Sequence, residues 1–158
     1  SETIDVLKSV EVCNHLGQRK LIKKDKLNLK YRSSNISDTD IITKAIFNLN
    51  YGDKNIIKDK IDSIKKRRLA SQPIKNKTSG STFKNPKNLY AAKLIEEAGC
   101  KGTNYGDAYV SDQHANFLIN RGNASATDIE NLGKIILDKV LTKFGIKLEW
   151  EVKIIGDR

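Results

Sequence analysis

The sequence SATDIENLGKIILDKVLTKFG occupies residues 125–145. It opens with Ser125 and, three residues later, Asp128, which is the capping-box pattern of a helix start. Apolar side chains then recur at helical spacing at Leu132, Ile136, Val140 and Phe144. Gly145 follows, at a position where helices commonly end in a left-handed residue. The pattern predicts an amphipathic helix that needs a further layer of structure against its apolar face.

The segments on either side of this helix supply that layer. We expect a short helix over 89–98, short strands over 109–110 and 115–119, and a final strand over 148–154. Gly99 is placed to end the short helix in a left-handed conformation. Alternation in the final strand puts Glu151 on its polar face. The second half is therefore expected to be a small two-layer α+β domain.

The first half is predicted to be rich in strands. We expect strands over 6–12, 19–23 and 41–49, one helical turn over 25–29, and a helix over 53–70. The first two strands flank a turn at 15–18 and predict a hairpin. Strands without partners are a liability, so these strands are expected to belong to a larger sheet. A domain boundary is expected near residues 71–75, which gives domains over 1–72 and 73–158.

The charge of the chain suggests an anionic partner. The 158 residues carry a net charge of +10, from 29 Lys and Arg against 19 Asp and Glu. Residues 1–80 hold 18 of the basic and 9 of the acidic residues. This excess allows a nucleic-acid-binding domain. However, 23 of the basic residues are Lys, and Ile, Lys and Asn dominate the composition, as an AT-rich genome would produce. A solvated basic face, or a small anionic ligand such as a diphosphate, fits the same charge.

The positions of the cysteines and the first residues of the chain further restrict the class of protein. Cys13 and Cys100 lie far apart and lack metal-type spacing, which argues against a disulfide framework or zinc cluster and favours a reducing compartment. No apolar run is long enough to cross a membrane, and no secretory leader opens the chain. The sequence lacks methionine and begins with Ser1, so we expect a processed or truncated N-terminus.

The loop SGSTFKNP, residues 79–86, is the first candidate site. Gly80 permits close approach of the backbone to a ligand, and Ser81 would be exposed beside it. Lys84 is suited to contact a phosphate. A flexible linker between domains is the alternative interpretation. The stretch is neither a P-loop nor a Gly-x-Ser-x-Gly elbow.

Three other positions carry chemistry that their surroundings leave open. His114 and Asn116 lie two residues apart and would point the same way on a strand, but a lone histidine is more often structural. Glu151 is either a site residue or an ordinary surface carboxylate. Arg32, taken alone, is one more surface arginine.

Six motifs, taken in order, resemble one family. They are YRSS at 31–34, GSTFKNP at 80–86, AKLIEEAG at 92–99, GDA at 106–108, HANFLIN at 114–120 and LEWEV at 148–152. The series resembles UDP-N-acetylenolpyruvoylglucosamine reductase, also called UDP-N-acetylmuramate dehydrogenase. The resemblance spans essentially the whole chain. The family has a longer subtype with an extra substrate-clamping loop. No insertion that would hold such a loop lies between Tyr31-Arg32 and the 79–86 loop, so the chain resembles the shorter subtype.

The resemblance implies a bacterial, cytoplasmic oxidoreductase of peptidoglycan synthesis that uses FAD and NADPH. Such an enzyme reduces UDP-N-acetylglucosamine enolpyruvate to UDP-N-acetylmuramate. The reduced flavin passes hydride to the enolpyruvyl methylene carbon, and a proton is added at the neighbouring carbon. The resemblance implies that the protein holds no metal ion and has neither nucleic acid nor a membrane as a partner.

The resemblance also assigns roles to individual residues. Ser81 matches the family's serine general acid. Arg32 and Glu151 match the two charged residues that bracket the substrate's carboxylate. Substrate-binding roles are implied for Asn85, His114, Lys84 and Arg67, with Arg68 as a further candidate for the diphosphate.

The sequence departs from the family at two positions and lacks one region. Trp150 stands where the family usually has proline, and Tyr109 stands where it often has glutamine. The family's N-terminal flavin-binding region, with its Gly-Gly-Gly-Ser-Asn loop, has no counterpart here. The resemblance therefore implies a C-terminal portion, with the end of an FAD-binding domain over 1–72 and a substrate-binding domain over 73–158, inactive by itself. A non-catalytic fragment that binds the sugar nucleotide is the alternative.

Overall fold

The computed structural model describes residues 2–156. The chain divides into two compact units, of which the first ends at Ile56 and the second begins at Ile57. Both units combine helices with antiparallel sheet, so the α+β prediction is confirmed. The assignment of 1–72 to flavin binding and 73–158 to substrate binding stays a prediction.

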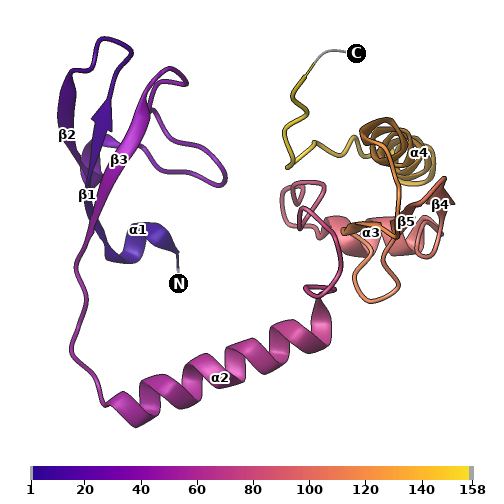
Figure 1. The fold of residues 1–158 in the computed structure, drawn as a ribbon, viewed down its shortest axis with the longest axis horizontal. Helices are drawn as coiled ribbons and strands as arrows, with labels where there is room; N and C mark the ends of the chain where they lie inside the picture. Colours follow the sequence, from indigo (N-terminus) through magenta and orange to yellow (C-terminus); the bar gives the residue numbers. More distant parts are fainter. Residues whose placement is uncertain (1, 157–158) are drawn as a thin grey trace. The chain divides into compact units, whose positions relative to one another are not determined.

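The first unit is built on a three-stranded antiparallel sheet (Figure 1). Its elements are α1 (Thr3–Val6), β1 (Leu7–Cys13), β2 (Arg19–Lys23), the 3-10 turn η1 (Lys24–Lys26) and β3 (Ile41–Phe47). The strand order is β2-β1-β3, with β1 in the centre. The predicted hairpin of β1 and β2 is confirmed. Its turn is closed by the side chain of Asn14, whose Oδ1 accepts from the backbone N–H groups of Leu16 (3.0 Å) and Gln18 (2.9 Å).

A small core forms around β1. Leu7, Val10 and Val12 of the strand are buried together with Leu27, which follows η1. Most side chains of β3 are exposed, and Ile41 keeps 69% of its surface accessible. The burial of this sheet is therefore concentrated on its central strand.

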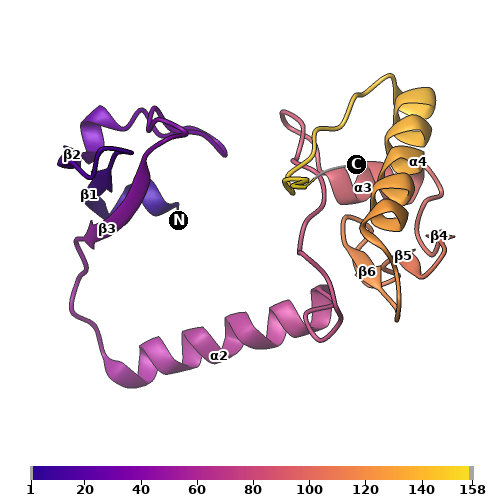
Figure 2. The same cartoon turned by 45° about the horizontal axis from the view of Figure 1, so that its top comes forward.

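The helix predicted over 53–70 is present as α2 (Lys54–Ser71) (Figure 2). Oδ1 of Asp53 accepts from the N–H groups of Asn55 (2.8 Å) and Ile56 (3.0 Å), which satisfies donors that the first turn leaves unpaired. None of its residues is buried, and Ile57, Ile61 and Ile64, which recur at helical spacing, keep 40–47% of their surface accessible. No helix within residues 2–156 is both long and apolar enough to cross a membrane.

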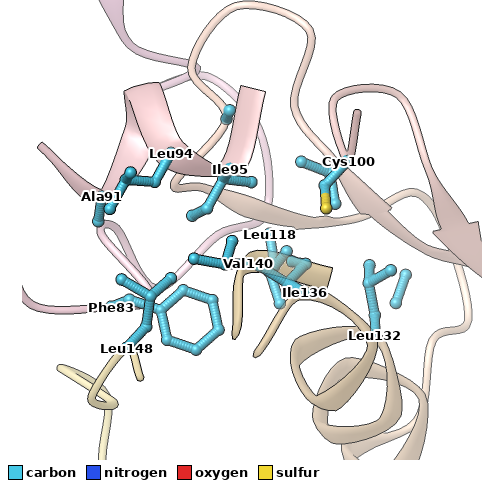
Figure 3. Close-up of a cluster of buried hydrophobic side chains, with 13 residues drawn as sticks. Phe83, Ala91, Leu94, Ile95, Cys100, Leu118, Leu132, Ile136, Val140 and Leu148 are labelled. Atoms are coloured by element: carbon cyan, nitrogen blue, oxygen red, sulfur yellow. The ribbon is translucent and has the colours of Figure 1, made fainter. Parts of the chain in front are cut away.

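The second unit packs two helices with a short antiparallel sheet. Its elements are α3 (Ala91–Glu97), β4 (Asn104–Tyr105), β5 (Ala108–Val110), β6 (Leu118–Asn120) and α4 (Ala126–Phe144). The strand order is β4-β5-β6, and α4 packs beside β4 and β5 (Figures 1 and 2). The apolar faces of both helices meet Phe83 and Leu148 in the main core (Figure 3).

The capping pattern that opened the sequence argument is confirmed in α4. Oγ of Ser125 accepts from the N–H of Asp128 (3.1 Å), and Oδ2 of Asp128 accepts from the N–H of Ser125 (2.8 Å). Gly145 ends the helix with a φ of 67°. Leu132, Ile136 and Val140 are buried, as their spacing predicts.

One predicted strand is wrong, and another is shorter than predicted. The final strand over 148–154 is absent, and Trp150 forms only a single bridge with Phe83. The carbonyl of Thr82 accepts from the N–H groups of both Glu151 (2.8 Å) and Val152 (3.5 Å), so two donors converge on one acceptor and the ladder stops. The strand predicted over 115–119 begins only at Leu118, because its first residues form a turn.

Candidate active site

The 79–86 loop is an integral part of the second unit rather than a flexible linker. The N–H of Thr82 donates to the carbonyl of Asn116 (2.8 Å), and the N–H of Lys84 donates to the carbonyl of Glu149 (2.8 Å). Ser81 forms a bridge with Phe117. The side chain of Phe83 is buried in the main core. The segment is therefore fixed by backbone hydrogen bonds to residues 116 and 149 and by the packing of Phe83 in the core.

Asn116 holds this segment through its side chain as well. Its Oδ1 accepts from the N–H of Phe83 (2.9 Å), and its Nδ2 donates to the carbonyl of Phe83 (2.8 Å). The sequence predicts Asn116 and His114 together on a strand, but both lie in the turn before β6. Local sequence gives no signal for this role, because the partner lies 33 positions away.

A cavity of about 430 Å³ lies beside Ser81. Its lining includes Arg68 and Gln72 from the end of α2 and just beyond it, and Ser79, Gly80 and Ser81 from the loop. Gly80 has a φ of 91°, and the space on its Cβ side is open. Ser81 is half-buried and lines the cavity.

A larger cavity of about 710 Å³ shares Thr78 and Ser79 with the first. It is lined by the first turns of α4 and by apolar residues including Leu118, Ile129 and Val152. We place the candidate site in the smaller cavity, because that one contains Ser81.

Basic residues near the loop differ in their surroundings. Nζ of Lys84 lies 3.3 Å from Oε2 of Glu149 in a partly exposed ion pair. Arg68 lines the cavity, and its Nε donates to Oε1 of Gln72 (3.4 Å). Arg67 is exposed on α2 and does not line this cavity.

Glu151 lies close to the loop through its backbone, whose N–H donates to the carbonyl of Thr82 (2.8 Å). Its side chain is half-buried. The predicted strand around Glu151 is wrong. Its backbone is nevertheless hydrogen-bonded to Thr82, the residue that follows Ser81. Asn85 is exposed, and its Oδ1 accepts from the N–H of Ala91 (3.0 Å), which caps α3.

His114 is half-buried and packs its ring edge-on against Phe117, with ring centroids 4.7 Å apart. Its Nδ1 accepts from the N–H of Asn116 (3.3 Å). Burial, and to a smaller extent the charge of Lys101, lowers the pKa of His114. The ring is therefore neutral at pH 7 and acts as a hydrogen-bonding group rather than as a fixed charge.

Replacing His114 by glutamine is expected to weaken the pH dependence of stability. The folded pKa lies below that of the unfolded chain, so the unfolded chain binds the proton more readily. Stability present above the unfolded pKa is lost as the pH falls through it towards the folded value. Urea unfolding from about pH 7.5 to about pH 5.5 should show a smaller loss in the variant. Parallel losses would contradict this.

Arg32 belongs to the first unit. It has a φ of 54°, in a left-handed conformation that is uncommon for residues other than glycine, and its guanidinium lies 5.2 Å from the ring centroid of Tyr31. Its turn is closed by hydrogen bonds between Lys30 and Ser33. Its grouping with Ser81 and Glu151 stays a prediction.

Comparison with known proteins gives consistent matches. A family model described as the C-terminal domain of UDP-N-acetylenolpyruvoylglucosamine reductase matches residues 72–155. A protein of that name from Rickettsia conorii is 41% identical over 156 residues, covering 99% of this chain and 53% of the relative. One from Clostridium tetani is 43% identical over 157 residues, covering 99% of this chain and 51% of the relative.

A solved structure agrees with these relatives. The crystal structure of UDP-N-acetylenolpyruvylglucosamine reductase from Thermus caldophilus has a TM-score of 0.79 and 34% sequence identity. The match covers 94% of this chain and 53% of that chain. The chain thus spans about half the length of the curated relatives it matches.

Proposed function

Because the chain belongs to the UDP-N-acetylenolpyruvoylglucosamine reductase family, we propose that it supplies the substrate-binding part of an NADPH-dependent oxidoreductase of bacterial peptidoglycan synthesis, acting in the cytoplasm. The proposed substrate is UDP-N-acetylglucosamine enolpyruvate, and the product is UDP-N-acetylmuramate. The observation that carries the proposal is the placement of Ser81, half-buried on an anchored segment at the edge of a cavity of about 430 Å³.

The residues around Ser81 fit a flavin ring. Gly80 has open space on its Cβ side, so a flat ring could approach its backbone without meeting a side chain. Bound FAD, reduced by NADPH, would supply the hydride for the enolpyruvyl methylene carbon. We assign Gly80 and Ser81 to the ring end of this site, and no described residue to the adenosine end.

Ser81 is proposed as the proton donor. Hydride addition leaves negative charge on the neighbouring carbon and on the carboxylate conjugated to it, and the hydroxyl of Ser81 gives its proton to that carbon. A serine hydroxyl is a weak acid in water, so the transfer depends on close and fixed placement. The backbone hydrogen bonds of Thr82 and Lys84 support this assignment, because they restrict movement of the segment next to Ser81.

Arg32 and Glu151 are proposed to act on the substrate's carboxylate. The Arg32 guanidinium stabilises the negative charge that spreads onto it. Glu151 polarises the same group, and its backbone bond to Thr82 keeps it near Ser81. Both assignments rest on the family motifs.

Asn85, His114, Lys84 and Arg67 are proposed to contact the sugar nucleotide. Lys84 is paired with Glu149, but exposed ion pairs contribute only about 0–1 kcal/mol. Lys84 can therefore leave Glu149 for a phosphate at little cost. Arg68 lines the Ser81 cavity, which makes it a stronger diphosphate candidate than its neighbour Arg67.

The proposal is tested by NADPH oxidation with added FAD, with and without the enolpyruvyl substrate. Two preparations are compared: this chain alone, and this chain joined to the N-terminal half of the Rickettsia conorii relative. We expect substrate-dependent oxidation of NADPH in whichever of the two preparations binds FAD. We expect no oxidation when UDP-N-acetylglucosamine, which lacks the enolpyruvyl group, replaces the substrate.

Other outcomes favour the alternatives. Saturable substrate binding without turnover in either preparation would favour a non-catalytic sugar-nucleotide-binding protein. Binding to nucleic acid that falls steeply with salt, together with indifference to UDP-sugars, would favour a nucleic-acid-binding domain.

A further inference from the structure

Asn116 makes an unusual set of contacts for a side chain outside the assigned site. Its side chain is 4% exposed. Both polar atoms of the side-chain amide form hydrogen bonds with the backbone of a single residue, Phe83. Its own carbonyl accepts from the N–H of Thr82 (2.8 Å). We propose that Asn116 is a positioning residue that fixes Ser81 and Glu151 relative to each other; this rests on the function proposed above.

The need for Asn116 follows from the pairing on the other side of the loop. Phe83 bridges Trp150, but the hydrogen bonds around that bridge use Lys84 and Thr82, not Phe83. The N–H and carbonyl of Phe83 therefore face the opposite side, where the segment that pairs with Ser81 turns at residues 115–116. The amide of Asn116 takes the place of a strand there, with one acceptor and one donor.

Few other side chains meet this requirement. A carboxylate only accepts, an aliphatic side chain does neither, and glutamine places the same amide one methylene further from its backbone. The Thr82 hydroxyl gives no help, because it is buried and has no hydrogen-bond partner among the described residues. The polar anchoring of the segment therefore depends on its backbone and on Asn116, beside the packing of the Phe83 ring in the core.

The anchored segment lies between the two proposed catalytic residues. Ser81 precedes Thr82 directly, and the carbonyl of Thr82 accepts from the N–H of Glu151 (2.8 Å). Phe83 is fixed on its other side by the core and by the Trp150 ring, whose centroid lies 4.9 Å away. Loosening Phe83 therefore shifts Ser81 against Glu151, and proton transfer is sensitive to such shifts.

The first test needs no cofactor. Amide hydrogen exchange is measured in this chain for Asn116→Ala and for the control Ile136→Val, which loses a buried methyl group in the same core but removes no hydrogen bond of the loop. We expect faster exchange at Thr82 and Phe83 in the Asn116 variant only. If Asn116→Ala does not fold, Asn116→Gln replaces it. Equal exchange at these amides in variant and control would overturn the proposal.

The second test separates positioning from general loss of structure. In the flavin-loaded protein that contains this sequence, Asn116→Ala should slow reoxidation of the flavin by saturating substrate about tenfold. Reduction by NADPH should be unchanged, and Ile136→Val should affect neither step. Unchanged reoxidation in the Asn116 variant would overturn the positioning role. If Ser81→Ala is also without effect, the proposed function itself has failed.

Discussion

Ser81→Ala will slow the reoxidation of the reduced flavin by the enolpyruvyl substrate by a factor of about 10² to 10⁴, which is the usual contribution of a general acid. Reduction of the flavin by NADPH will proceed at the unaltered rate. The reason is chemical: alanine has no proton to give, while hydride transfer to the flavin requires none from this position. The variant should fold normally, since Ser81 is half-buried and its bridge to Phe117 is formed by the backbone.

The experiment is a stopped-flow measurement of the two half-reactions, recorded separately by flavin absorbance. Ser79→Ala is the matched control, because Ser79 is a second serine that lines the same cavity. It should leave both rates within about a factor of two, as expected for a residue without a proton-transfer role. An equal loss in both half-reactions of Ser81→Ala would contradict the proton-donor role, as would an equal loss in the Ser79 control.

Gly133→Ala will lower the free energy of unfolding of the second unit, although alanine is the better helix former by about 1 kcal/mol. A Cβ at this position of α4 would lie 2.8 Å from Cζ3 and 2.9 Å from Cζ2 of Trp150, and closer still to Cη2. The indole ring would have to move, and overpacking of this kind costs about 1–3 kcal/mol. The helix gain offsets only part of that cost.

Denaturant unfolding of the single and double variants tests this explanation. Trp150→Leu removes the ring that the new methyl group would meet, so Gly133→Ala should be neutral or stabilising in that background. The double-mutant cycle thus gives a coupling between the two positions. A stabilising effect of Gly133→Ala alone, or the same loss in both backgrounds, would show that the ring does not occupy this space.

Periodic elements were accessible from the sequence. The hairpin of β1 and β2, helix α2, and helix α4 with its cap were predicted because each depends on residues close together in the chain. The final strand was wrong because an alternating pattern also occurs in an extended segment that pairs at one residue only. Alternation reports which side chains face inward, not whether a partner strand exists.

The candidate site was accessible only in part. Family motifs pointed to Ser81 and Glu151, and the structure bonds Glu151 to the residue next to Ser81. The role of Asn116 was missed because its partner is a peptide group, which has no sequence signature. Trp150 was noticed as a departure from proline, but Gly133, which leaves room for its ring, was not. Such complementarity joins residues 17 positions apart and needs coordinates to be seen.

Trp150 is the single tryptophan of the chain, and its half-buried ring rests on Phe83 in the same segment as Ser81. Tryptophan fluorescence therefore has a single source, which packs on the loop that carries Ser81. A change in the intensity or colour of that emission when a sugar nucleotide is added would report on the surroundings of this ring. Titrations followed in this way need no dye, label or turnover assay.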